Sequence, residues 1–215
     1  MTTPFDQARY QIRFEWGVAG LDRLDPADVT VVVDVLRFSS TVAARVAAGE
    51  SVPLDDSAHR VSLNGAAVAA HAAGSARPGA VVLLGGLTNA TAVAAGILDE
   101  QRRRGTRTSI NVIAAGELTS RAAGAPLRFA VEDLLGAGAV IDALAVIGLD
   151  YSSPEAAAAC ESFRSLRGAV RHLLTASGSG QELLDRDQRD EVLAAGAIDS
   201  RTAVPVLREG VFVAL

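Results

Sequence analysis

The chain has 215 residues, 49% of them hydrophobic, and a formal net charge of −5. This composition supports one large buried core and excludes a disordered chain, and an acidic balance without a basic run argues against a nucleic-acid partner. No apolar stretch is long enough to span a membrane. Cys160 is the only cysteine, which excludes an intrachain disulfide and favours a cytoplasmic location.

Every cationic side chain is an arginine, and the chain has no lysine. A lysine Schiff base, and with it pyridoxal phosphate chemistry, is therefore excluded. The phosphate-binding P-loop also needs a lysine before its Ser or Thr, so the common nucleotide-hydrolase motif is excluded as well.

The pattern of predicted strands sets the fold class. Residues 10–16 alternate polar and apolar side chains and predict an edge strand. Uninterrupted apolar runs predict buried strands of a parallel sheet at residues 29–35, 80–84 and 109–114. Two shorter runs around Glu209-Gly210, residues 204–207 and 211–215, predict a hairpin.

Helices are predicted between and after these strands, near residues 41–48, 64–74, 89–104 and 130–144, with further helical segments to about residue 195. We therefore expect an α/β fold, a mostly parallel buried sheet flanked by helices, in a single compact unit over residues 1–215. The alternative left open is a smaller lobe built from the chain ends. A homo-oligomer is also left open.

The most informative motif follows the strand at residues 29–35. Asp34 ends the valine run, Arg37 follows three residues later, and Ser39, Ser40 and Thr41 come where the next helix begins. A carboxylate that can hold a hard cation, next to a guanidinium that can bind phosphate oxygens, suits a magnesium-assisted phosphoryl site at the carboxyl end of a strand. The alternative is a capped helix after a strand, with Asp34 and Arg37 paired only to each other.

Other strand exits carry glycine and amide side chains. Gly86 and Asn89 follow the strand at 80–84, and Asn64-Gly65 opens a helix. If these exits converge on one edge of the sheet, glycines allow a close backbone approach to phosphate and helix starts supply free N–H groups. The alternative is that such residues occur at the strand–helix turns of any α/β protein.

Glu132-Asp133 lies near the start of the helix at 130–144. With Asp34, these carboxylates are the candidate metal ligands. The alternative is that acidic residues in a first helical turn are stabilised by the helix dipole alone.

These motifs, together with Gly116-Glu117 and the C-terminal pattern from Ser179-Gly180 to Glu209-Gly210, resemble the 2-phosphosulfolactate phosphatase family over about residues 28–213. The resemblance implies an α/β fold and a Mg²⁺-dependent phosphatase that converts 2-phospho-3-sulfolactate to sulfolactate and phosphate, on the route to coenzyme M. Its partner would be a small anionic phosphorylated substrate.

Other phosphatase mechanisms do not match the residues. Asp34 lacks the second aspartate two positions later that an aspartyl-phosphate enzyme needs, Cys160 lacks an arginine six positions later, and Arg171-His172 lacks the following glycine. Elimination favours metal-assisted attack by water without a covalent Cys or His intermediate. The alternatives are a non-catalytic binder of a small phosphorylated or sulfonated acid, and a phosphatase for a different small substrate.

We expect Asp34 and Arg37 to be catalytic, and Asp34→Asn to abolish hydrolysis while the thermal stability stays close to wild type. Ser39, Ser40, Thr41, Asn64, Gly65, Gly86 and Asn89 are the expected substrate-binding residues. Because no second arginine is placed by a motif and the segment 50–63 is short, we expect weak discrimination among small 2-phospho acids.

Overall fold

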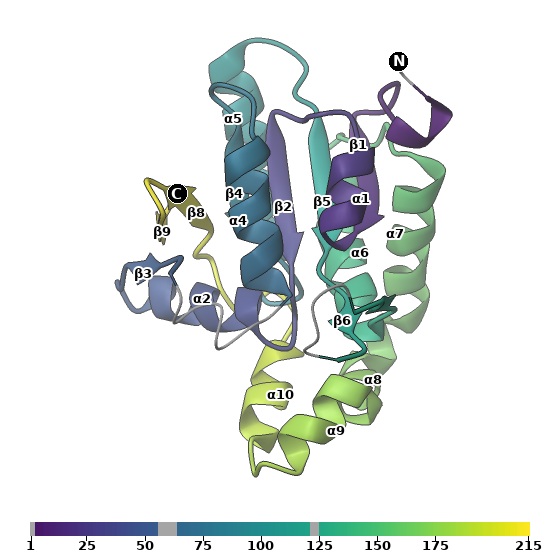
Figure 1. Cartoon of the computed structure of the whole chain (residues 1–215), viewed down its shortest axis with the longest axis vertical. Helices are drawn as coiled ribbons and strands as arrows, with labels where there is room; N and C mark the ends of the chain where they lie inside the picture. Colours follow the sequence, from purple (N-terminus) through teal and green to yellow (C-terminus); the bar gives the residue numbers. More distant parts are fainter. Residues whose placement is uncertain (1–2, 56–63, 121–124) are drawn as a thin grey trace.

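A computed structural model describes residues 3–55, 64–120 and 125–215, and its centre is a seven-stranded mixed sheet (Figure 1). The strand order is β1-β5-β2-β4-β8-β9-β3. The parallel strands are β1 (Ile12–Trp16), β5 (Ile110–Ala114), β2 (Val29–Val33) and β4 (Val81–Leu84). The antiparallel strands are β8 (Pro205–Arg208), β9 (Val211–Ala214) and β3 (Val52–Pro53). The predicted α/β class with a parallel core is confirmed.

The valine run of β2 forms the middle of the sheet because both of its faces are covered. Val31 and Val33 pack into one apolar cluster and Val32 into the other, as the alternation of side chains along a strand requires. In register, Val31 lies between Val112 of β5 and Leu83 of β4.

One face of the sheet carries α5 (Ala90–Arg104), α6 (Val131–Val146) and α7 (Pro154–Leu166), which are long and rich in small residues. The 3₁₀ segment η2 (Arg167–Ala169) and the short helix α8 (Val170–Ala176) follow α7. Gly138 of α6 lies against α7 so closely that a Cβ there would be 2.2 Å from the carbonyl oxygen of Ala159. Small residues therefore set the short distance between these two helices.

The opposite face carries α1 (Gly17–Arg23), α2 (Phe38–Ala47) and α4 (Gly65–Ser75), and α1 and α4 lie in front of the sheet in Figure 1. Two further helices, α9 (Gly178–Leu184) and α10 (Arg189–Ala195), gather with α8 beyond the ends of the strands toward which the arrow of β2 points (Figure 1). The carboxyl ends of β2 and β5 thus face this group of helices, and the candidate site lies there.

Several local features differ from the prediction. The 3₁₀ segment η1 (Pro4–Asp6), helix α1 and a two-stranded sheet of β6 (Glu117–Leu118) and β7 (Leu127–Arg128) were not predicted, and α2 begins at Phe38 rather than near residue 41. Both ends of the chain add strands to the main sheet, so these strands do not build a smaller lobe. Among the described helices, none is both long and apolar enough to cross a bilayer.

Strand β1 lies at the edge of the sheet, as predicted, but it is more buried than the alternating pattern indicated. Arg13 is only 3% exposed, because its guanidinium donates to the main-chain carbonyls of Tyr10, Asp25 and Ala8. The polar side chain of Arg13 was read as a sign that the strand is exposed, but it is a buried donor whose hydrogen bonds are satisfied.

Candidate functional site

Asp34 follows the last residue of β2, and its buried carboxylate connects two helix starts. Its Oδ1 accepts the main-chain N–H of Phe38, the first residue of α2, at 3.1 Å, and its Oδ2 accepts that of Gly65, the first residue of α4, at 3.0 Å. The hydroxyl of Ser39 accepts the N–H of Asp34 itself at 3.0 Å. Free N–H groups at helix starts favour negative charge, so the local backbone fixes this carboxylate at the strand end.

Asp133, in the first turn of α6, holds the exits of two strands. Its Oδ1 accepts the N–H of Val35 at 2.8 Å and its Oδ2 accepts the N–H of Gly116 at 2.9 Å. Burial raises the pKa of Asp133 well above its ordinary value, and the negative charges of Asp34 and Glu132 raise it further, against the two N–H donors. Asp133 is therefore close enough to Asp34 and to Glu132 for their negative charges to oppose its ionisation.

Glu132 belongs to a chain of polar contacts that crosses the site. The hydroxyl of Ser179, in α9, lies 2.6 Å from Glu132 Oε1 and 3.1 Å from Glu117 Oε2. The side-chain N–H₂ of Asn64 donates to Glu117 Oε1 at 3.2 Å. A serine hydroxyl has one proton, so it can donate to only one of these two carboxylates at a time. The other carboxylate faces an oxygen atom.

The chemical types of the donor atoms are those that a hard divalent cation prefers. The atoms are carboxylate oxygens of Asp34, Glu117, Glu132 and Asp133, and the Oδ1 of Asn64, which is buried and accepts no hydrogen bond from the described residues. Oxygen ligands are those that Mg²⁺ prefers, and a carboxylate oxygen that accepts one N–H retains a second lone pair. Within the described ranges, however, no three acidic, His or Cys side chains converge at metal-binding spacing. The ligand roles of Asp34, Glu132 and Asp133 stay predictions.

Arg37 lies in a different environment. Its guanidinium forms an ion pair with Glu191 of α10. Together with Ser40 and Thr41 it lines a cavity of about 450 Å³, to which Arg201 also contributes. The Ser40 hydroxyl donates to the carbonyl oxygen of Val35 at 2.9 Å. The alternative pairing of Arg37 with Asp34 is not among its described ion pairs, and three of the predicted anion-binding residues share this cavity.

Asn89 and Gly86 have clear roles in packing. The Asn89 side chain donates to the carbonyl oxygens of Leu84, at 3.3 Å, and Ala203, at 3.1 Å. Gly86 is buried against α6, where a Cβ on Gly136 would lie 3.6 Å from the Gly86 Cα. These contacts join β4 to the C-terminal segment and to α6, and substrate contacts by either residue remain predictions.

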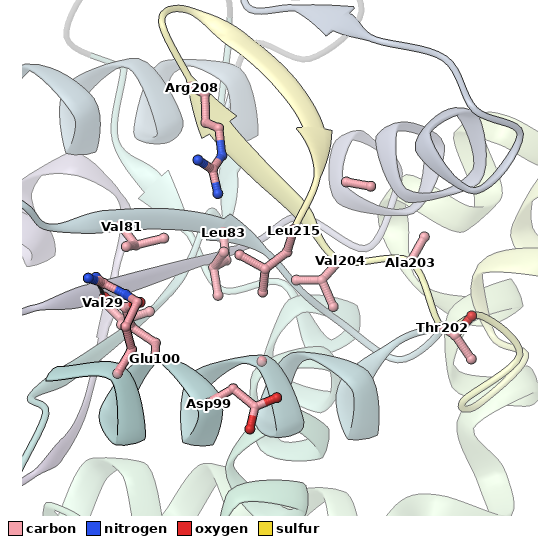
Figure 2. A pocket seen from close by; sticks show the side chains of 13 residues that line it. Val29, Val81, Leu83, Asp99, Glu100, Thr202, Ala203, Val204, Arg208 and Leu215 are labelled. Carbon is pink, nitrogen blue, oxygen red and sulfur yellow. Dashed lines mark hydrogen bonds and ion pairs between the residues drawn. The ribbon is translucent and has the colours of Figure 1, made fainter. Parts of the chain in front are cut away.

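A cavity of about 520 Å³, larger than the one beside Arg37, is elsewhere in the molecule (Figure 2). It lies between α5 and the β8–β9 hairpin, and its lining includes the apolar side chains of Leu83, Val204 and Leu215, with Arg208 and Glu100 also bordering it. It contains none of the predicted site residues, so cavity size alone does not identify the site. A smaller cavity of about 270 Å³ lies beside Asn64 and is mainly apolar.

The side chains of Glu117 and Arg128 had no assigned role in the sequence analysis, and the contacts of the Ser179 hydroxyl with two carboxylates were not predicted. Glu117 was seen as part of a strand exit, but the contact between its carboxylate and Ser179, about 60 positions along the chain, has no local sequence signal. Arg128 lies in a two-residue strand with no periodicity to detect. Only the tertiary fold brings them together.

Carboxylates and helix starts gathered at the carboxyl ends of parallel strands are the arrangement in which α/β enzymes bind their ligands. A family model described as 2-phosphosulpholactate phosphatase matches residues 55–210, and the chain belongs to this family, whose members are named as hydrolases. The matched range begins after the Asp34–Arg37 segment. Residues 56–63, most of the short segment noted above, lie within the match but outside the described residues.

Proposed function

We propose that this chain is a Mg²⁺-dependent phosphatase that hydrolyses the phosphate monoester of a small 2-hydroxy acid, with 2-phospho-3-sulfolactate as the first candidate substrate. Family membership supports phosphomonoester hydrolysis. The observation that carries the metal requirement is the single Ser179 proton between Glu132 and Glu117. Glu132 is buried, and Glu117 is partly exposed and also accepts the Asn64 side chain. The one Ser179 proton cannot serve both carboxylates at once, and a bound cation would relieve their repulsion.

The residues that would hold the cation are Asp34, Glu132 and Asp133, with Glu117 and the Oδ1 of Asn64 as further oxygen donors. When bound, Mg²⁺ neutralises phosphate charge and lowers the pKa of a coordinated water. Asp133 would also have a structural role, because it accepts hydrogen bonds from the N–H groups of Val35 and Gly116 and so positions the carboxyl ends of β2 and β5 at the site.

Arg37 would be the charge partner of the phosphate, with Ser40 and Thr41 as neutral donors nearby. Its fork of N–H groups matches phosphate oxygens, but in the structure the guanidinium is engaged by Glu191. Substrate must therefore compete with this ion pair. Both side chains are partly exposed, at 29% and 45%, so the pair is weak enough to be exchanged.

Ser39, Asn64, Gly65, Gly86 and Asn89 belong to the same proposal as residues that shape the substrate-binding edge. Attack by water without a covalent Cys or His intermediate is part of the same proposal, and the oxygen donors named above would supply the metal site for it. A cytoplasmic location and a place in coenzyme M biosynthesis are further parts of the proposal.

The test is phosphate release by the purified protein from 2-phosphosulfolactate, 2-phospholactate, 3-phosphoglycerate and p-nitrophenyl phosphate, with Mg²⁺ or with EDTA. We expect hydrolysis of at least the 2-phospho acids that EDTA abolishes and Mg²⁺ restores. Hydrolysis unaffected by EDTA would overturn the metal requirement. Binding of the phospho acids without hydrolysis of any would support the non-catalytic binder instead.

A further inference from the structure

Arg128 is an exposed arginine at the edge of the carboxylate cluster. It is paired in register with Glu117 across the small β6–β7 sheet, so the two side chains start from the same face of that sheet. Within the described residues, no carboxylate lies within 4.0 Å of its guanidinium and no hydrogen bond of it is found, in contrast to Arg37, which has Glu191. The position of this arginine beside an acidic cluster, with no ion pair among the described residues, calls for an explanation.

The hairpin that carries Arg128 is anchored by its neighbour. Leu127 packs so closely on Gly17 and Gly116 that Cβ atoms there would lie 2.9 and 3.0 Å from its side chain, and both glycines have positive φ angles, of 60° and 69°. Successive side chains of a strand point to opposite faces. With Leu127 held against α1 and the exit of β5, Arg128 is directed to the other side.

On that side the guanidinium reaches the start of α9. Its Nη2 lies 2.7 Å from the point where a Cβ on residue 178 would be, so the glycine at this position leaves the space that the guanidinium occupies. The next residue, Ser179, contacts both Glu132 and Glu117. The Arg128 guanidinium therefore lies next to Gly178, the residue before Ser179, and Ser179 contacts the carboxylates that the proposed function assigns to the cation.

We propose that Arg128 binds an anionic group of the substrate other than its phosphate, a carboxylate or a sulfonate. This inference rests on the proposed function. A cation held by the carboxylates would attract the phosphate, and a second anionic group two or three bonds away needs its own donor. The planar guanidinium offers two parallel N–H groups, which match two oxygens of a carboxylate or sulfonate. Arg128 is thus the second arginine that the sequence motifs did not place.

The proposal is tested with two substrates that share the phosphate and differ in the other anionic groups. For Arg128→Ala we expect kcat/KM for 2-phosphosulfolactate to fall by about tenfold or more, mainly through KM, while kcat/KM for p-nitrophenyl phosphate stays within about twofold. Arg128→Lys should recover part of the loss. The matched control is Arg208→Ala, another exposed arginine at the end of a strand, on the β8–β9 hairpin.

A second variant moves the guanidinium without removing it. A Cβ on Gly178→Ala would occupy the space of the Arg128 Nη2 and displace the end of this flexible side chain, so this variant should show a loss for the acid substrate that is smaller than that of Arg128→Ala. Gly168→Ala is the control, because no heavy atom lies within 4 Å of its added Cβ. Equal losses on both substrates, or no loss on either, would overturn the proposal.

A binding measurement separates this proposal from the proposed function. Calorimetry with 3-sulfolactate, which has the carboxylate and the sulfonate but no phosphate, should show binding to wild type and about tenfold weaker binding to Arg128→Ala. If wild type hydrolyses none of the substrates but shows this difference, the phosphatase proposal fails and the anion site stands. If 3-sulfolactate binds equally well to both proteins, or to neither, the anion site is overturned.

Discussion

The main chain of Gly65 packs against the carboxylate of Asp34 so closely that there is no room for a side chain at position 65. The main-chain N–H of Gly65 donates to Asp34 Oδ2 at 3.0 Å, and a Cβ on Gly65 would lie 2.4 Å from that same oxygen. The start of α4 can therefore approach the end of β2 this closely only because residue 65 has no side chain. The glycine thus determines where the carboxylate of Asp34 lies.

Gly65→Ala should displace the Asp34 carboxylate without changing any charge. We expect overpacking to lower the unfolding free energy by about 1–3 kcal/mol and the phosphatase activity to fall by about tenfold or more. Thermal melts and kcat/KM measure the two effects. Gly74→Ala, near the other end of the same helix, meets no heavy atom within 4 Å and should keep full activity. Equal behaviour of the two variants would contradict this role of Gly65.

Asp34→Asn should abolish hydrolysis. The sequence analysis expected the stability of this variant to stay close to that of wild type, but the structure predicts a loss of stability. Asp34 accepts N–H groups on both carboxylate oxygens, from Phe38 and Gly65. An asparagine has one oxygen, so one of these N–H groups would face the amide nitrogen, at a cost of about 1–3 kcal/mol. Denaturant unfolding measures the change, and an unchanged midpoint would contradict the two-acceptor geometry.

Glu117→Gln should reduce the stabilisation by Mg²⁺. Its amide can donate to the Ser179 oxygen and leave the hydroxyl proton to Glu132, so the metal-free variant should melt at or above the temperature of wild type. Thermal melts with and without Mg²⁺ should show a clear rise in Tm for wild type and a smaller one for the variant. Glu182→Gln, whose carboxylate is 72% exposed on α9, is the control. The same rise in all three proteins would place the cation elsewhere.

Exchange of the Arg37–Glu191 pair predicts opposite effects of two variants on KM. Arg37→Lys should raise KM and lower kcat, because an ammonium cannot replace the two-pronged guanidinium. Glu191→Gln should lower KM by up to about fivefold, because it frees Arg37 from an exposed pair worth at most about 1 kcal/mol. Steady-state kinetics on one phospho acid checks both variants. Normal kinetics for Arg37→Lys would support a purely structural ion pair.

Asp28 predicts a pH dependence of stability outside the site. Burial opposes its ionisation, but the N–H and O–H of Ser109 and the charges of Arg77 and Arg104 outweigh burial and lower the pKa of Asp28. A lowered pKa in the folded state stabilises above the unfolded value of about 3.9, and this stability is lost as the pH falls through the folded pKa. Asp28→Asn should therefore cost about 2 kcal/mol at neutral pH and progressively less below pH of about 4. The measurement is urea unfolding at several pH values, with Asp185→Asn, at an exposed position, as the control.

The parallel core and the C-terminal hairpin of the fold could be predicted from the sequence because their signals are local. The valine run of β2 and the turn at Glu209-Gly210, with φ angles of 49° and 78°, need only neighbouring residues to be identified. The β6–β7 sheet could not be predicted in this way. Its strands have two residues each, and Leu127 is held by contacts with Gly17 and Gly116 rather than by any periodic pattern.

For the candidate site, too, residues with a local sequence signal could be predicted and contacts between distant segments could not. Asp34 and Asp133 were identified because each follows a recognisable strand end or helix start. The partners of Arg37 and Glu132 could not be identified, since Glu191 and Ser179 come from helices α10 and α9, far along the chain. Charge pairs between distant segments depend on the tertiary arrangement, which residue spacing does not encode.

The pairing of β3 with β9 has a consequence for the order in which the chain can fold. Val52 pairs with Phe212, so a strand made early in synthesis has its only described partner strand near residue 212. Until that segment leaves the ribosome, the apolar surface of α2 and the outer edge of β4 lack the hairpin that covers them. A nascent chain stalled before residue 204 would therefore expose a free sheet edge, the kind of surface that recruits chaperones or aggregates.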